Sequence, residues 1–136
     1  MFNSRESKQA AGKTVLVVDD EPNIVRTVSD RLKMNGYRVI TATDGQEAIE
    51  RALEEKPDLI LLDVLMPRLD GHAALERLRQ MEETRSTPVI MLTALDQTQH
   101  VARASSMGIA DYVVKPFDLL VLLQKVKSAL SNGKER

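Results

Sequence analysis

The stretch VLVVDDEP, residues 15–22, decides the fold together with LILLD, residues 59–63. In each stretch, four consecutive apolar residues, rich in Val, Ile and Leu, lead directly into aspartate. Unbroken apolar runs of this kind are typical of strands that are buried on both faces, as in a parallel sheet. Because ligands of open α/β sheets bind beyond the carboxyl ends of the strands, we expect Asp19, Asp20 and Asp63 to meet at one edge of a sheet.

Three carboxylates that lie close together repel one another. At a separation of about 4 Å and an effective dielectric constant of about 20, each pair contributes about 4 kcal/mol of repulsion. A bound cation offsets this repulsion, and a hard dication with oxygen ligands, Mg²⁺ before the others, is the expected occupant. The sequence therefore predicts a magnesium site at this edge.

Composition narrows the class of protein. The chain has 136 residues, of which 43% are hydrophobic, and a formal net charge of -1. This length fits one domain with a substantial core, and the charge gives no overall basic footprint for nucleic acid. The chain has no cysteine, which excludes disulfides and thiol chemistry. No apolar stretch approaches the roughly 20 residues that span a bilayer, and residues 1–13 lack a hydrophobic signal region. We therefore expect a cytoplasmic domain without direct contacts to membrane or nucleic acid.

Strand and helix signals alternate along the chain. The expected strands are Thr14–Val18, Tyr37–Ala42, Asp58–Leu62, Pro88–Leu92 and Ala110–Val114. The expected helices are Pro22–Asn35, a segment around Ala48–Leu53, a segment around Ala74–Met81, Gln97–Met107 and Asp118–Leu130. Such alternation predicts a doubly wound α/β domain, a five-stranded parallel sheet with right-handed crossovers and helices on both faces. We expect the domain to occupy residues 13–131, with a flexible extension at residues 1–12 and a tail at residues 132–136.

Two further polar residues stand at predicted strand ends. Thr93 follows the apolar run at residues 89–92, and Lys115 follows residues 112–114 and precedes Pro116. Together with the three aspartates they form a set suited to a phosphoryl group. A carboxylate can act as nucleophile, while a carboxylate-bound metal, a lysine and a hydroxyl can neutralise the phosphoryl oxygens.

At this point the chain resembles the receiver domains of response regulators, the phosphoacceptor part of two-component signalling. The resemblance covers roughly residues 13–130 and rests on four motifs in order: VLVVDDEP (15–22), LILLDVLMPRLDG (59–71), VIMLTA (89–94) and GIADYVVKPF (108–117). It implies a CheY-like (βα)5 fold with strand order 2-1-3-4-5.

The resemblance also implies a role for each residue of the acidic site. Asp63 matches the phosphorylated aspartate, and Lys115 matches the lysine that contacts the phosphoryl group. Asp20 matches the direct metal ligand, and Asp19 matches the acid that usually helps through water. The main-chain carbonyl of Leu65 falls where the family supplies another ligand to Mg²⁺.

The remaining implied roles concern switching and partners. Thr93 matches the hydroxyl that moves onto the phosphoryl group, Tyr112 matches the aromatic residue that turns inward, and Pro116 follows a bond that is often cis in the family. The implied donor is a sensor histidine kinase or a phosphotransfer protein. The implied output surface, formed by the fourth helix, fifth strand and fifth helix, controls a downstream protein or output domain. Leu120 and Val121 give the fifth helix an unusually apolar first turn, which predicts either a partner or homodimer surface there or a deeply buried helix.

The expected function is therefore a phosphoryl-accepting switch that catalyses its own phosphorylation and dephosphorylation, rather than a conventional enzyme. A haloacid-dehalogenase-like phosphatase would need a second aspartate at position 65, where the chain has Leu65. A receiver-like binding module that takes no phosphate is the alternative, and the chain is either a stand-alone receiver or part of a longer DNA-binding regulator. Leu65 and Leu95 are expected to hinder the hydrolytic water and lengthen the phosphoryl lifetime. His72 and His100 are expected to face solvent.

Overall fold

The computed structural model describes residues 12–66, 68–94, 102 and 104–134. Most of the predicted N-terminal extension therefore lies outside the described residues, as do Leu95, His100 and most of the predicted helix Gln97–Met107. Within that helix, Ala102, Ala104 and Ser105 are described and are helical.

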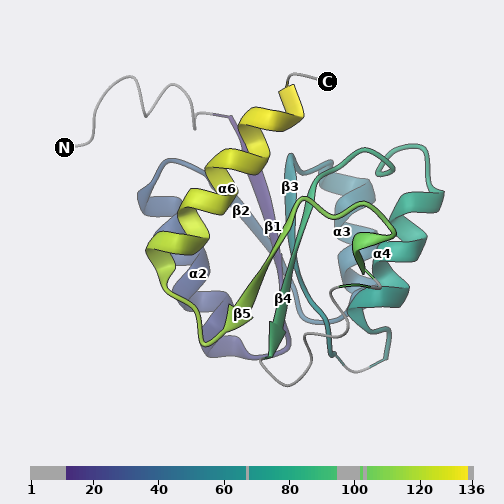
Figure 1. The fold of residues 1–136 in the computed structure, drawn as a ribbon, viewed down its shortest axis with the longest axis horizontal. Helices are drawn as coiled ribbons and strands as arrows, with labels where there is room; N and C mark the ends of the chain where they lie inside the picture. The colour runs from purple at the N-terminus through teal and green to yellow at the C-terminus, as the bar shows by residue number, and fades with distance from the viewer. Residues whose placement is uncertain (1–11, 67, 95–101, 103, 135–136) are drawn as a thin grey trace.

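Five parallel strands form one sheet in the order β2-β1-β3-β4-β5 (Figure 1). The strands are β1 (Thr14–Val18), β2 (Arg38–Ala42), β3 (Leu59–Asp63), β4 (Val89–Ala94) and β5 (Asp111–Lys115). The helices are α2 (Pro22–Met34), α3 (Gly45–Glu55), α4 (Gly71–Gln80) and α6 (Leu119–Lys134). The predicted doubly wound α/β fold is confirmed, including the order of its strands.

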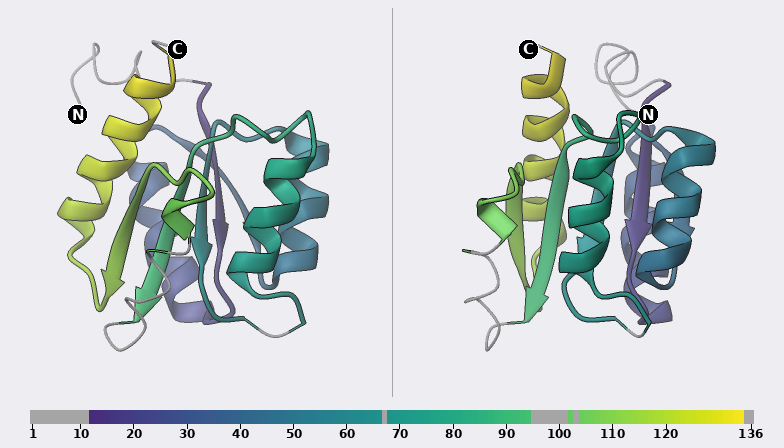
Figure 2. Two further views of the ribbon diagram at one scale, coloured as in Figure 1. Left: turned by 45° about the vertical axis from the view of Figure 1, so that its right-hand side comes forward. Right: turned by 90° about the vertical axis from the view of Figure 1, so that its right-hand side faces the viewer.

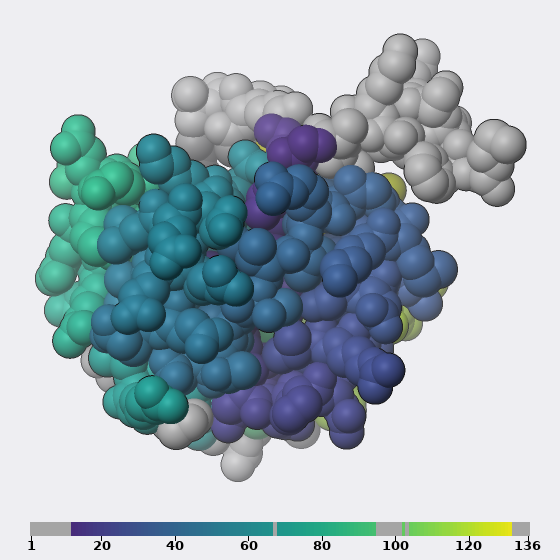
Figure 3. All heavy atoms as spheres, turned by 180° about the vertical axis from the view of Figure 1, so that it is seen from behind, coloured from purple at the N-terminus to yellow at the C-terminus, as the bar shows by residue number. Residues whose placement is uncertain are grey.

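The sheet lies between two layers of helices (Figure 2), and an apolar cluster fills the space on each of its faces. Helices α2 and α6 cover one face, and α3 and α4 cover the other. Because successive strand residues point to opposite faces, Val15 and Val17 join the first cluster while Leu16 and Val18 join the second. This two-sided burial is the physical reason for the unbroken apolar run that opens the chain's first motif. Seen from behind, the side chains of α2 and α3 cover the surface (Figure 3).

Helix boundaries follow local signals. Pro22 occupies the first position of α2, where its missing N–H removes no hydrogen bond. Asp44 and Asp70 cap α3 and α4, accepting hydrogen bonds from the N–H groups of Glu47 and Ala73. These caps fix where α3 and α4 begin, directly beyond the carboxyl edge of the sheet.

The structure corrects two details of the sequence analysis. Helix α6 ends at Lys134 rather than near Leu130. The prediction that His72 faces solvent is wrong, because only 2% of this residue is exposed. His72 stands three residues before the buried Leu75, so the two share the face of α4 that packs toward the sheet. Among the described residues, no helix combines the length and the apolar character needed to cross a membrane.

Candidate functional site

The carboxyl ends of four strands place the predicted site residues at one edge of the sheet. Asp63 is the last residue of β3, and Asp19 directly follows its neighbour β1. Thr93 lies near the end of β4, and Lys115 is the last residue of β5. The parallel registers of these strands bring residues that are far apart in sequence to the same level of the sheet.

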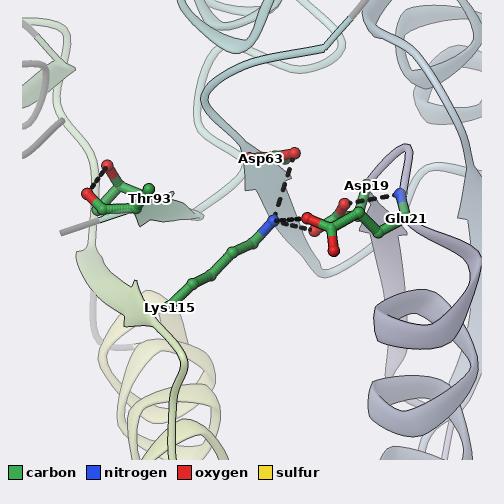
Figure 4. Close-up of polar contacts among 6 residues, drawn as sticks. Asp19, Glu21, Asp63, Thr93 and Lys115 are labelled. Carbon is green, nitrogen blue, oxygen red and sulfur yellow. Dashed lines mark hydrogen bonds and ion pairs between the residues drawn. The ribbon is translucent and has the colours of Figure 1, made fainter. Parts of the chain in front are cut away.

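Lys115 is the centre of the site (Figure 4). Its Nζ lies 2.7 Å from Oδ2 of Asp19, 3.3 Å from Oε1 of Glu21 and 3.5 Å from Oδ2 of Asp63. The Lys115 side chain is only 14% exposed, and its peptide bond to Pro116 is cis. The ammonium group therefore joins three carboxylates that come from β3 and from the segment between β1 and α2.

Asp19, Asp20 and Asp63 form an acidic cluster. Each offers a carboxylate oxygen, and these oxygens all lie within 4.8 Å of one another. Asp19 and Asp63 are buried, whereas Asp20 is exposed, so the cluster opens to solvent on the Asp20 side. The backbone N–H of Glu21 donates to Oδ1 of Asp19 at 2.9 Å and orients that carboxylate. Hard oxygen ligands at this spacing suit a hard dication.

The environment of Asp63 disfavours its charged form. Burial and the negative charges of Asp19 and Asp20 raise the pKa of Asp63 to about 7, although Lys115 opposes this shift. For Lys115, burial alone would lower the pKa, but the hydrogen bond to Asp19 and the charges of Asp63 and Asp19 outweigh it and raise the pKa. Lys115 is thus firmly cationic, while Asp63 changes charge near neutral pH.

The two predicted switch residues lie in different environments. Thr93 is fully buried, and its hydroxyl donates to the carbonyl of Ala94 at 3.2 Å. In Figure 4 this hydrogen bond lies away from the contacts that Lys115 makes with the carboxylates. Tyr112 is 40% exposed and is not brought into the acidic cluster. The Nζ of Lys125 lies 5.5 Å from the centre of the Tyr112 ring and donates to the Tyr112 carbonyl at 3.1 Å.

Sequence reasoning missed two residues of the site, Glu21 and Gly71. Glu21 is given no role by the sequence analysis, although it stands two residues after Asp19 in VLVVDDEP and its Oε1 lies 3.3 Å from Nζ of Lys115. Gly71 donates its N–H to the carbonyl of Val64 at 2.8 Å. A β carbon at Gly71 would overlap the carbonyl oxygen of Asp63, so a side chain there would push against the backbone of Asp63.

Leu65, two residues beyond Asp63, is exposed at 45%. Its side chain therefore lies at the surface of the loop between β3 and α4, as expected for a residue at the rim of the site.

Comparisons with known proteins identify one family. The family model described as the response regulator receiver domain matches residues 15–127. The alkaline phosphatase synthesis transcriptional regulatory protein PhoP of Bacillus subtilis is 44% identical over 118 residues, or 87% of this chain. The DNA-binding dual master transcriptional regulator RpaA of Synechocystis is 42% identical over 116 residues, or 85% of this chain. Each alignment covers 48% of the relative, so the chain spans about half the length of these curated relatives.

Solved structures of response regulators are also similar to this chain. A putative response regulator from Chloroflexus aurantiacus superposes with a TM-score of 0.83 at 34% identity, covering 88% of this chain and 98% of that one. The chemotaxis response regulator CheY4 of Vibrio cholerae has a TM-score of 0.81 at 33% identity, with coverages of 86% and 98%. With its fold, its motifs and most of its length matched, this chain belongs to the response regulator receiver domain family.

Proposed function

We propose that this receiver is a phosphoryl-accepting switch in which Asp63 takes a phosphoryl group from a phosphohistidine. The donor is a sensor histidine kinase or a phosphotransfer protein. The observation that carries the proposal is the placement of Asp63 at a strand end, with the ammonium group of Lys115 3.5 Å from its carboxylate. A nucleophilic oxygen and a cation beside it are the two elements that phosphoryl transfer to a carboxylate needs.

The proposed transfer step uses these two groups. A carboxylate oxygen of Asp63 attacks phosphorus, the phosphorus–nitrogen bond of the donor breaks, and the histidine leaves with its electron pair and takes up a proton. Lys115 donates to an oxygen of the transferred group, which replaces part of its pairing with Asp63. Since little covalent chemistry is left for other side chains, positioning and charge neutralisation supply the catalysis.

The acidic cluster fits Mg²⁺, because its three carboxylates are hard oxygen ligands within 4.8 Å of one another. Asp20 and Asp63 would hold the ion directly, with Asp19 acting through water and the main-chain carbonyl of Leu65 as a further ligand. When bound, the ion supplies positive charge for the phosphoryl oxygens. A dication beside Asp63 also favours its carboxylate form and so opposes the burial that raises the pKa of this group.

Phosphorylation then changes the charge beside Thr93. The new group carries roughly -1.5 to -2 charges and strong acceptor oxygens, so we expect the Thr93 hydroxyl to leave the Ala94 carbonyl and donate to it. Tyr112, which is exposed in this structure, is expected to turn inward behind Thr93. The phosphoryl group thus shifts the populations of two pre-existing states.

The proposed output is control of a partner protein or of an attached output domain. The relatives PhoP and RpaA are named as transcriptional regulators and are about twice as long as the matched region. In this proposal the receiver acts in the cytoplasm and does not itself contact DNA. Leu120 and Val121, exposed at 62% and 42%, supply apolar surface on the first turn of α6 for a partner or for a second phosphorylated copy.

Intact-mass spectrometry tests the proposal. Incubation with Mg²⁺ and acetyl phosphate should add one phosphoryl group to the wild type and none to Asp63→Asn. A decay series should then show a long-lived adduct, because Leu65 and Leu95 are expected to hinder the hydrolytic water. Absence of any addition, even with phosphorylated kinase as donor, would overturn the proposal in favour of a receiver-like module that binds partners without phosphate.

A further inference from the structure

The loop between β3 and α4 carries Leu65, and a hydrogen bond joins its two ends. The N–H of Gly71, at the end of the loop, donates to the carbonyl of Val64 at its beginning, and Gly71 packs directly against Asp63. Before that point, the loop passes beneath the start of α3, at the lower right of Figure 1. There the N–H of Gly45 donates to the carbonyl of Leu69 at 3.1 Å.

Gly45 leaves no room for a side chain at this crossing. A β carbon on Gly45 would overlap the carbonyl oxygen of Leu69, and it would lie 2.9 Å from the Leu69 carbonyl carbon and 3.0 Å from Leu69 Cβ. Two of these neighbours are backbone atoms, which cannot move aside as the end of a flexible side chain can. Any larger residue at position 45 therefore shifts the loop or the start of α3.

Asp44 fixes the same loop through its side chain. One carboxylate oxygen accepts the N–H of Glu47 at 2.8 Å and caps α3, while the other lies 3.5 Å from Nε of Arg68. The Asp44 side chain is 7% exposed, although that of Arg68 is 78% exposed. A single buried carboxylate thus contacts both the first turn of α3 and the loop that follows Asp63, and its ion pair with the exposed Arg68 is a weaker restraint than the backbone crossing at Gly45.

The backbone of Arg68 shows why the loop needs to be held. Its φ is +68°, a left-handed conformation in which the β carbon of a non-glycine residue crowds the backbone. Residues in such conformations persist only where their surroundings determine them. The contacts on both sides of Arg68, from Asp44 to its side chain and from Gly45 to Leu69, are those surroundings.

We propose that Asp44 and Gly45 are positioning residues for the acidic site, although neither touches it. By holding Arg68 and Leu69, they keep the segment from Asp63 to Leu65 in the geometry that binds a dication. The inference deepens the proposed function and rests on it, because loop position matters only if this loop supplies a ligand. Groups that hydrogen-bond a metal ligand directly typically contribute 10–100-fold to metal affinity, and we expect the lower end of that range for residues that act one contact further away.

The test measures Mg²⁺ affinity by calorimetry and the phosphorylation rate with acetyl phosphate, for variants that circular dichroism shows to be folded. Gly45→Ala should weaken Mg²⁺ binding about tenfold or more and slow phosphorylation at limiting Mg²⁺, with recovery at saturating Mg²⁺. A role in stability alone would leave the affinity of the folded protein unchanged. Gly108→Ala is the control for a glycine-to-alanine change away from the loop. Unlike Gly45, Gly108 has a positive φ of 78°, and the space around its β position is open. This variant should strain its own backbone but bind Mg²⁺ like the wild type.

Two further variants separate positioning from simple charge and remain informative if Gly45→Ala fails to fold. Asp44→Asn keeps a capping side chain but loses its negative charge, whereas Arg68→Gln loses a positive charge. If long-range electrostatics alone mattered, Asp44→Asn would weaken Mg²⁺ binding and Arg68→Gln would strengthen it. Loss of the ion pair that the two residues share should instead weaken Mg²⁺ binding in both variants. Opposite changes, or wild-type affinity in Gly45→Ala, would overturn the inference. A wild type that neither binds Mg²⁺ nor accepts phosphate would instead refute the proposed function.

Discussion

The raised pKa of Asp63 predicts that removing its charge stabilises the protein at high pH. Burial and the charges of Asp19 and Asp20 move this pKa from an ordinary value of 3.8 to about 7. Between those values the folded state holds a proton that the unfolded state has lost, so the free energy of unfolding falls as pH rises through this window. Asp63→Asn removes the titrating group and should lose this part of the pH dependence.

The expected magnitude follows from the same two values. One pKa unit corresponds to about 1.4 kcal/mol, so linkage gives a penalty of about 4 kcal/mol near pH 8 and about 2 kcal/mol near pH 5. Solvent reaches the cluster beside Asp20 and screens part of this repulsion. We therefore expect the stabilisation by Asp63→Asn to be larger near pH 8 than near pH 5 by about 1–2 kcal/mol.

Urea unfolding at the two pH values, without divalent cations, measures this difference. Asp30→Asn, the same substitution on an exposed face of α2, serves as the control and should not alter the pH dependence. Added Mg²⁺ should stabilise the wild type much more than Asp63→Asn, because binding to the folded state adds to its stability. A variant that is no more stable than the wild type near pH 8, or equally stabilised at both pH values, would refute the electrostatic account of the site.

Three further predictions concern other contacts. Glu21→Gln should change the free energy of unfolding by less than about 1 kcal/mol, because Glu21 is 60% exposed in its pair with Lys115. The same variant should accelerate phosphorylation by acetyl phosphate, because it removes a negative charge near the acceptor, and a slower rate in the mass assay would contradict this. Arg79→Met should lower the free energy of unfolding by about 2–4 kcal/mol in urea titrations, because the Arg79 guanidinium donates to four backbone carbonyls. A loss below about 1 kcal/mol would show that those carbonyls find other donors. Leu120→Ser should leave stability within about 0.5 kcal/mol and weaken partner binding or self-association of the phosphorylated protein, measured by sedimentation; unchanged association would move the output surface elsewhere.

Local sequence signals accounted for most of the fold. The apolar runs at residues 15–18 and 59–62 predict buried strands because both faces of a doubly wound sheet are covered, and β1 lies where it was expected. The other strands lie within one or two residues of their predicted bounds. His72 was misjudged for a related reason: a lone polar residue in a helix gives no local signal of its burial, and only the packing of α4 shows which face it shares.

By itself, the sequence determined the order of strands and helices, the acidic cluster beyond the strand ends and the family to which the chain is similar. These features depend on periodicity and on residues adjacent along the chain, which a single sequence records. Only the tertiary structure decided which carboxylates share Lys115, how strongly burial raises the pKa of Asp63, and that Asp44 and Gly45 hold the loop beyond it. Those properties arise between segments that are far apart in sequence, where distance, desolvation and exclusion of a β carbon depend on the packed arrangement of the whole domain.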